Sequence, residues 1–292
     1  MYKLITFYCT LLMGITTCFA QSATKSTAAA NKSLLWKISG KGLKKPSYLF
    51  GTIHMICTAD YVWTPAMDKA LQSSERVAFE MDMDDPQLQT QMATGLMLKD
   101  GKKLKDLYSE ADYQKLSAFA AKNGLPLEMM QQYSPFALVS FLYMKALTCP
   151  MPASYEGNIT GLAQAQKKEI LGLETVEEQV AVIEKMNMDS LAGMVLNITN
   201  DMDSFKNTFN QILAVYKKQD LPELYKLFLE SPDYKDDLNA LLFDRNRKWV
   251  PAIEKLVGQQ STFVAVGAGH LWGGEGVISL LRQAGYTVEP VK

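Results

Sequence analysis

Tyr48-Leu49-Phe50-Gly51-Thr52-Ile53-His54 is the segment that decides the fold, because an apolar run ends there in the pattern Gly-x-x-His. Phe263-Val264-Ala265-Val266-Gly267-Ala268-Gly269-His270 repeats this pattern near the other end of the chain. Each apolar run is typical of a buried strand. Active sites of open α/β sheets lie outside the carboxyl ends of strands. The repeat therefore predicts an α/β fold that brings His54 and His270 together at one edge of a sheet.

Further apolar runs predict strands at both ends of the chain and helices between them. The predicted strands are 34–38, 47–53, 76–81, 169–174, 262–266 and 286–288. The predicted helices are 65–74, a helical region over 86–147, 157–168, a helix that Thr175 and Glu178 cap, a long amphipathic helix around 205–216 and 275–284. Helices continue to about residue 257, and we expect breaks near Pro222 and Pro251.

The chain shows no fixed repeat and no composition break between two domains. We therefore predict a single α/β domain, residues 34–292, with a large helical insertion or cap.

Composition excludes several classes of protein. The 292 residues include 30 basic and 31 acidic side chains, and 48% of them are hydrophobic. A disordered chain would be poorer in apolar residues and less balanced in charge. A net charge of -1 provides no electrostatic footprint for nucleic acid, so we expect no nucleic-acid partner.

The first residues have the pattern of a secretory signal peptide. Lys3 precedes an apolar run over residues 4–17, which is too short to span a membrane, and Ala20 offers a small residue for cleavage. Residues 21–33 form a predicted flexible linker. We expect a periplasmic or secreted protein without stable membrane insertion after cleavage. An uncleaved anchor and a lipoprotein acylated at Cys18 are the alternatives.

Two cysteines, Cys57 and Cys149, remain after removal of residues 1–20. An even pair in an oxidising compartment permits a disulfide, and two free thiols are the alternative. A bridge would close a loop of about 90 residues, for which the chain-entropy model gives ~4 kcal/mol of stabilisation.

Polar side chains near other strand ends are candidates for chemistry. Glu80 follows Val77-Ala78-Phe79, and Glu174 follows Leu171-Gly172-Leu173. Asp244-Arg245-Asn246-Arg247 interrupts a helical stretch, so Arg245 and Asn246 are candidates to bind or orient a substrate. The alternatives are a solvated acidic loop for Glu80, a helix-start charge for Glu174 and a surface ion-pair cluster for Arg245 and Asn246.

Two histidines and a carboxylate form a plausible site for a divalent metal. His54, Glu80 and His270 are the candidate ligands, and a spare carboxylate such as Glu80 or Glu174 is a candidate proton carrier. The sequence contains none of the contiguous patterns HExxH, GxSxG, GxxxxGK[ST] or GxGxxG. A Ser-His-Asp triad would leave one of the two histidines unexplained.

Read together, these motifs resemble the TraB/PrgY/GumN family over roughly residues 34–291. The family is similar to the TIKI metalloproteases, which cleave secreted signalling proteins and depend on manganese or cobalt. More distantly it resembles the erythromycin-esterase-like (EreA) and ChaN-like folds, which implies a mixed central sheet. The resemblance implies His54, Glu80 and His270 as core site residues. Glu174, Arg245 and Asn246 fall on family motif positions.

Three hypotheses follow for the function. The first is a metal-dependent hydrolase, most plausibly a peptidase, that uses manganese, cobalt or zinc and takes a peptide or protein substrate. The second is a non-catalytic protein that sequesters a peptide or haem. The third is a scaffold in which both histidines are structural. The sequence does not indicate an oligomeric state.

Overall fold

The structure is a computed structural model that describes residues 32–231 and 237–292. The expected signal peptide, and nearly all of the expected linker, lie outside the described residues. Both expectations therefore stay predictions.

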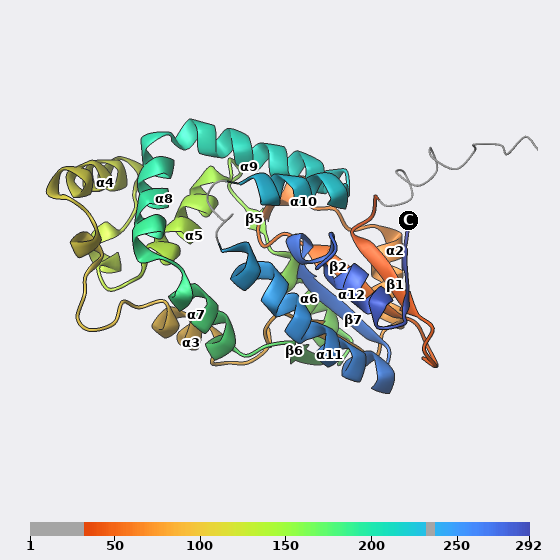
Figure 1. Ribbon diagram of the computed structural model, residues 1–292. Helices are drawn as coiled ribbons and strands as arrows, with labels where there is room; N and C mark the ends of the chain where they lie inside the picture. Colours follow the sequence, from red (N-terminus) through yellow and green to blue (C-terminus); the bar gives the residue numbers. More distant parts are fainter. Residues whose placement is uncertain (1–31, 232–236) are drawn as a thin grey trace, which may run out of the picture.

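Within the described residues, six strands form one mixed sheet in the order β6-β4-β7-β2-β1-β8 (Figure 1). Their bounds are β1 (Leu35–Ser39), β2 (Ser47–Thr52), β4 (Arg76–Phe79), β6 (Glu169–Gly172), β7 (Thr262–Gly267) and β8 (Thr287–Pro290). Strands β2, β7, β4 and β6 are parallel, whereas β1 pairs antiparallel with β2 and β8. The α/β class with a mixed sheet is confirmed. The four parallel strands end at the same edge.

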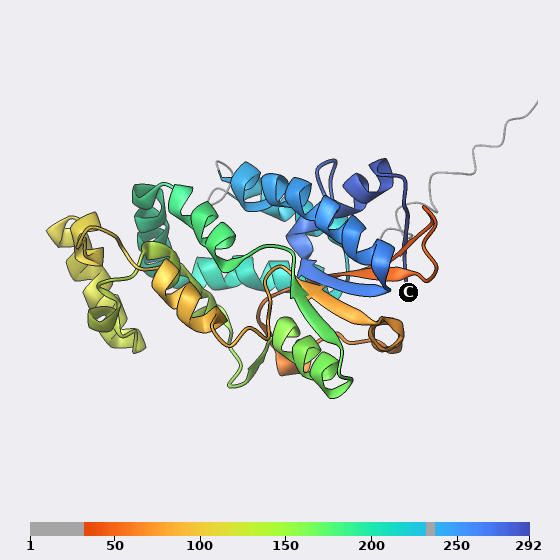
Figure 2. The same ribbon diagram turned by 90° about the horizontal axis from the view of Figure 1, so that it is seen from below.

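Helices cover both faces of the sheet, with α11 and α12 on one side and α6 on the other (Figure 2). The bounds of these helices and of the neighbouring α2 are α2 (Pro65–Ser73), α6 (Tyr155–Ala165), α11 (Asp244–Gln259) and α12 (Val277–Gln283). Local chemistry starts two of them. The side chains of Thr64 and Ser154 accept backbone N–H groups of the first turns of α2 and α6.

The remaining helices form a lobe beside the sheet and a bridge to it. They are α3 (Leu88–Gly95), α4 (Glu110–Asn123), α5 (Pro135–Ala146), α7 (Val176–Lys185), α8 (Met188–Asn200), α9 (Met202–Lys217), α10 (Leu221–Glu230) and the short helices η2 (Leu104–Leu107) and η3 (Leu127–Met130). Two further short helices, η1 (Thr58–Asp60) and η5 (Ala268–His270), lie outside the lobe, in the loops after β2 and β7. The lobe has its own apolar cluster around Leu116, Leu138 and Val195. The carboxyl half of α9 instead packs against the sheet core, so α9 connects the two (Figure 1).

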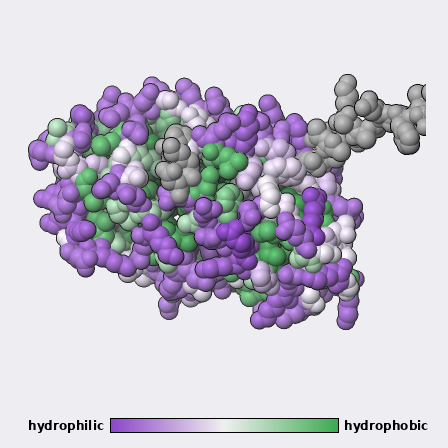
Figure 3. All heavy atoms as spheres, in the orientation of Figure 1, coloured by the Kyte–Doolittle hydropathy of each residue, from purple (hydrophilic) through white to green (hydrophobic). Residues whose placement is uncertain are grey.

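Apolar side chains gather over the middle of the face shown in Figure 3, and the rim of that face is hydrophilic. The described residues contain no helix that is both long enough and apolar enough to cross a membrane.

Two expectations about helix breaks were wrong. Pro251 lies inside α11 and does not interrupt it. A proline removes one hydrogen bond of the helix, and the buried side chains of Trp249, Val250 and Ile253 hold this helix against the core on both sides of that position. Asp244-Arg245-Asn246-Arg247 also does not break a helix, because these residues open α11 directly after the π-helical turn η4 (Asn239–Phe243).

A two-stranded ribbon that the sequence did not predict joins two distant loops. Strand β3 (Ile56–Cys57) pairs antiparallel with β5 (Pro152–Ala153). A disulfide between Cys57 and Cys149 lies at this ribbon, so the expected bridge is confirmed. Together the ribbon and the bridge hold the loop after β2 against the start of α6.

Candidate functional site

The edge where the parallel strands end carries most of the expected site residues. Glu80 directly follows β4, and Glu174 comes two residues after β6. His54 comes two residues after β2, and His270 lies at the end of the short turn η5 that follows β7. The register of β2 and β7 pairs Thr52 with Gly267, so the two Gly-x-x-His motifs lie on neighbouring strands.

Both Gly-x-x-His motifs need a glycine because neighbouring atoms approach the backbone closely at that position. A Cβ at Gly51 would lie 3.0 Å from Leu271 Cδ2 and 3.1 Å from the Ala268 backbone. A Cβ at Gly267 would lie 3.2 Å from Glu80 Oε1. Neither position has space for a larger residue without movement of its neighbours. Both glycines therefore reflect close packing at the strand ends, of Gly51 against Ala268 and Leu271 and of Gly267 against Glu80.

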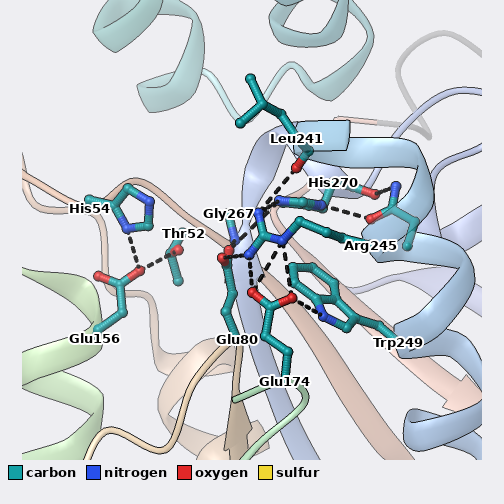
Figure 4. A network of polar contacts seen from close by, with 11 residues as sticks. Thr52, His54, Glu80, Glu156, Glu174, Leu241, Arg245, Trp249, Gly267 and His270 are labelled. Atoms are coloured by element: carbon teal, nitrogen blue, oxygen red, sulfur yellow. Dashed lines mark hydrogen bonds and ion pairs between the residues drawn. The ribbon is translucent and has the colours of Figure 1, made fainter. Parts of the chain in front are cut away.

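Arg245 is the centre of the site, and each of its five N–H groups has an acceptor (Figure 4). Nη2 donates to Glu80 Oε2 at 2.6 Å and to Glu174 Oε1 at 2.5 Å. Nε faces both oxygens of Glu174 at 3.1 and 3.2 Å. Nη1 lies 3.1 Å from the Leu241 carbonyl oxygen and 3.2 Å from His270 Nε2. The guanidinium is thus fixed in one orientation, as buried charge pairs require.

Trp249 closes the site from the side of α11. Its ring lies 4.5 Å from the Arg245 guanidinium carbon and 4.4 Å from the centroid of the His270 ring. Its indole N–H donates to Glu174 Oε2 at 3.1 Å. The ring thereby excludes water from one side of Arg245 and His270, where a cation–π contact adds to the ion pairs.

The protonation state of His270 follows from its neighbours. The Asn246 side-chain nitrogen donates to the carbonyl oxygens of His270 and Glu275 at 3.3 and 2.8 Å, so its oxygen is the atom that faces His270 Nδ1 at 2.7 Å. These partners assign the proton to Nδ1 and leave the lone pair on Nε2. Burial lowers the pKa of His270 to about 3, so the ring is neutral at neutral pH.

The two carboxylates that bind Arg245, Glu80 and Glu174, differ in pKa. Burial alone would raise the pKa of Glu80. The positive charges of His270, once that ring is protonated in acid, and of Arg245 and His54 outweigh burial and hold that pKa at about 2. The Gly267 backbone N–H also donates to Glu80 Oε1 at 2.8 Å. Burial raises the pKa of Glu174 in spite of Arg245. Glu80 therefore stays ionised, and Glu174 is the carboxylate of the pair that accepts a proton more readily.

His54 lies on the open side of the site. Its side chain is 75% exposed, whereas that of His270 is 6% exposed. His54 Nδ1 lies 3.2 Å from Glu156 Oε1, which also accepts the Thr52 hydroxyl at 2.7 Å. The bond to Glu156 raises the pKa of His54 to about 9. Burial alone would raise the pKa of Glu156, but its bonds to His54 and Thr52 lower it.

Glu156 is, with Trp249, a site residue that sequence reasoning missed. It lies in the first turn of α6, two residues after the cap Ser154, where an acid is typical as a favourable charge at a helix start. The cysteine pair is the sequence feature that could have identified Glu156. Cys57 follows His54 by three residues and Cys149 precedes Glu156 by seven, so a bridge between them brings Glu156 towards His54.

The donor atoms suit a divalent cation in charge and in type. Glu80 and Glu174 share the single guanidinium of Arg245, and Glu156 adds a third carboxylate beside His54. Nitrogen and carboxylate oxygen are common ligands of zinc and manganese. Among residues 32–231 and 237–292, however, no three His, Cys, Asp or Glu side chains are arranged to hold a metal ion. His54 and His270 lie on opposite sides of Glu80 (Figure 4), and Arg245 occupies His270 Nε2.

An acidic hollow of about 410 Å³ adjoins Glu174. Asp82, Asp85, Glu177 and Glu178 line it together with the loop that follows β6. Burial and the neighbouring Asp84 and Asp85 raise the pKa of Asp82. Negative charge therefore extends from the site along the ends of β4 and β6.

Comparison with known proteins gives similarity to metalloproteases. Metalloprotease TIKI2 of Danio rerio is 27% identical over 88% of this chain and 60% of its own length. Metalloprotease TIKI1 of Homo sapiens is 26% identical over 88% of this chain and 61% of its own length. The Metalloprotease TIKI homolog of Nematostella vectensis is 23% identical over 93% and 70%. The chain thus spans about 60% of the length of the first two relatives. No solved structure matches it significantly, so the EreA-like and ChaN-like comparison stays a prediction.

A protein-family model matches nearly the whole described chain. It matches residues 34–290, which include every strand of the sheet and every side chain of the site. The chain belongs to the TraB/PrgY/gumN family.

Proposed function

We propose that this protein is a metal-dependent peptidase whose site is the strand edge that carries His54, Glu80 and His270. The chain belongs to a family with relatives that are named metalloproteases, and its site combines imidazole and carboxylate donors. The proposed substrate is a peptide or protein outside the cytoplasm. The disulfide fits an oxidising compartment.

One observation carries the proposal. Both histidines hold Nδ1 against a side-chain oxygen, of Glu156 for His54 and of Asn246 for His270. This arrangement fixes the tautomer and leaves Nε2 as the ring atom that could meet a cation, and metal-binding histidines almost always have such a partner. At His270 a cation would have to displace the Arg245 N–H from Nε2. A structural histidine needs no such pairing at both members of a repeated motif.

The roles of the residues follow from their contacts. His54, Glu80 and His270 would hold the cation, whose chemistry when bound is Lewis-acid activation of the peptide carbonyl and of water. The low pKa of Glu80 suits a ligand more than a proton carrier. Glu156 orients His54 and raises the pKa of that ring to about 9, so a cation at Nε2 would have to displace a proton from His54.

Glu174, Arg245 and Asn246 act through the ligands in this proposal. Arg245 fixes Glu80, Glu174 fixes Arg245, and Asn246 fixes the His270 ring. We therefore propose them as positioning residues. Glu174 carries a second possible role, because burial raises its pKa and makes it the better proton acceptor of the two carboxylates on Arg245.

The test compares metal binding and peptide cleavage in the full chain, expressed with its own N-terminal segment. We expect the purified protein to contain a divalent metal, to lose peptide cleavage in a chelator and to regain it with manganese, cobalt or zinc. His54→Ala and His270→Ala should each abolish tight binding. The double variant should be little worse than either single variant, because ligands that share one ion are not additive.

Two glutamates at opposite ends of β4 provide a matched control. Glu80→Gln should remove metal affinity if Glu80 is a ligand, or only turnover if it is a base. Glu75→Gln, at the amino end of the same strand, should change neither. Additive effects of the two histidine changes on affinity, or binding that requires neither histidine, would contradict the proposal. A bound peptide that mass spectrometry recovers intact would identify a sequestering protein.

A further inference from the structure

A groove of about 390 Å³ lies beside the amino end of α6. Its lining residues are Tyr61, Trp63, Gly157, Asn158, Gly161 and Leu162. None of them carries a formal charge, because burial raises the pKa of Tyr61 to about 12 and its phenol stays neutral. The groove is therefore an uncharged, largely aromatic and aliphatic surface, in contrast with the charged residues of the candidate site.

Two features make the groove suitable for an aromatic or large aliphatic side chain. Tyr61 stacks on Tyr155 at 4.3 Å and on Trp63 at 6.4 Å, so its wall is a fixed aromatic array. On the opposite side, Gly161 has no described atom within 4 Å of an added Cβ, which leaves the space above α6 open.

The groove is joined covalently to the open half of the candidate site. Gly157 directly follows Glu156, the partner of His54. The segment with Tyr61 and Trp63 directly follows the β3 ribbon and η1, and thus continues from His54. The disulfide between Cys57 and Cys149 ties these two segments together. Both walls of the groove are therefore held in register with the His54–Glu156 pair.

We propose that this groove binds a large apolar or aromatic side chain of the peptide substrate and selects the residue next to the bond that is cut. The inference rests on the proposed peptidase function, since it assigns the substrate specificity of that site. A charged side chain fits less well, because the groove offers it no counter-ion and burial without one is costly.

Gly161→Leu tests the groove directly. A Cβ at this position meets open space, and a glycine inside a helix is less favourable than most residues, so the variant should fold at least as well as the wild type. The leucine side chain would fill the groove. Gly193→Leu is the matched control, because Gly193 lies inside α8 in the separate helical lobe and also has no described atom within 4 Å of an added Cβ.

The first measurement is cleavage of peptides that differ only at one position, with Phe, Ala or Glu there. We expect kcat/KM to favour Phe over Ala by about tenfold or more at one position next to the cut, as apolar pockets discriminate side chains. Gly161→Leu should bring this preference down to about one, whereas Gly193→Leu should leave it unchanged.

The second measurement does not depend on catalysis. Saturation-transfer NMR of the capped tripeptide Ala-Phe-Ala, with Ala-Ala-Ala and Ala-Glu-Ala for comparison, reports contact with the Phe ring. The ring should receive saturation from the wild type and from Gly193→Leu, and much less from Gly161→Leu.

The two measurements separate the groove from the peptidase proposal. Absence of any cleavage, together with Phe binding that Gly161→Leu removes, would reject the peptidase but support the groove. Cleavage without a preference for large apolar residues, or Phe binding that Gly161→Leu leaves intact, would overturn the groove.

Discussion

The two histidines of this protein follow the same Gly-x-x-His pattern on neighbouring strands, yet they lie in opposite surroundings. His270 is 6% exposed and touches Arg245, Asn246 and Trp249. His54 is 75% exposed and bonds only to Glu156 among the contacts that fix its ring. Burial lowers the pKa of His270, and the bond to Glu156 raises that of His54.

The difference shows that one local motif supports two chemical roles. On the buried side, the network around Arg245 fixes every polar atom, so a change there should affect stability most. On the open side, the disulfide and one carboxylate hold His54, so a change to that carboxylate should affect mainly the histidine itself. The following predictions test this division.

Arg245→Met should have the largest effect. The change leaves Glu80 and Glu174 buried without their counter-ion, and breaking one side of a buried ion pair costs about 3–5 kcal/mol. Urea denaturation of the metal-free protein measures this loss in the free energy of unfolding. Arg247→Met is the control, because Arg247 forms ion pairs at the surface with Asp244 and Glu275, and its effect should be much smaller. Equal losses in the free energy of unfolding for the two variants would contradict the special role of the buried Arg245 network in stability.

Replacement of both Cys57 and Cys149 by Ser should have the next largest effect. Residues 57 and 149 are 92 apart, and the chain-entropy model gives about 4 kcal/mol for a loop of this size, although measured values are often lower. The NMR signal of His54 should shift, and that of His270 should stay. A shift of His270 instead would mean that the bridge supports the buried side.

Asn246→Leu should cost about 1–3 kcal/mol, because His270 Nδ1 and two carbonyl oxygens lose a buried partner. The change should also release the His270 tautomer, which ¹⁵N NMR of the ring nitrogens detects directly. The protein contains only two histidines, so the assignment needs no further variant. An unchanged tautomer would show that Arg245 and Trp249 suffice to hold the ring.

Acid should destabilise the metal-free protein through His270. Its pKa is about 3 in the folded state, against 6.5 for a histidine exposed to water in the unfolded chain, so the unfolded state binds the extra proton between these pH values. The stabilisation is complete above pH 6.5 and falls as the pH falls, by about 1.4 kcal/mol per pH unit. Glu80, with a pKa of about 2, adds its own loss below its usual range. A free energy of unfolding that stays flat between pH 6 and 5 would contradict the buried, neutral state of His270.

Alkali should act through His54, with the smallest effect. Its folded pKa is about 9, so its contribution is complete below pH 6.5 and disappears as the pH rises through 9. Water screens this exposed pair, and we expect less than about 1 kcal/mol. Glu156→Gln should lower the pKa of His54 towards 6.5 and abolish this pH dependence, while the His270 signal stays unchanged. A His54 pKa that does not fall would assign its charge to another partner.

Much of the fold followed from local patterns. The strands, the cap at Thr175 with Glu178 and the amphipathic helix α9 were predicted near their actual bounds. The placement of His54 and His270 at one sheet edge was also predicted, because active sites of open α/β sheets lie at the carboxyl ends of strands. Glu80 and Glu174 were each predicted to follow a strand. The ribbon β3–β5 was missed, since two-residue strands have no periodicity to detect.

The site was harder to predict where it depends on long-range packing. Arg245 and Asn246 were selected, but they were expected to break a helix that in fact begins with them. Glu156 and Trp249 were missed because each reads locally as an ordinary helix residue. Their roles arise from contacts with His54, Glu174 and Arg245, which lie far from them in the sequence.

The sequence by itself determined which side chains stand at the ends of the strands, because strand length, glycine spacing and helix caps depend on neighbouring residues. Only the tertiary structure decided the chemical state of those side chains. Arg245 and Glu80 are 165 residues apart, and His54 and Glu156 are 102 apart. The charge, tautomer and exposure of each side chain depend on such distant partners and on burial. The residues next to each histidine in the sequence do not reveal either of these.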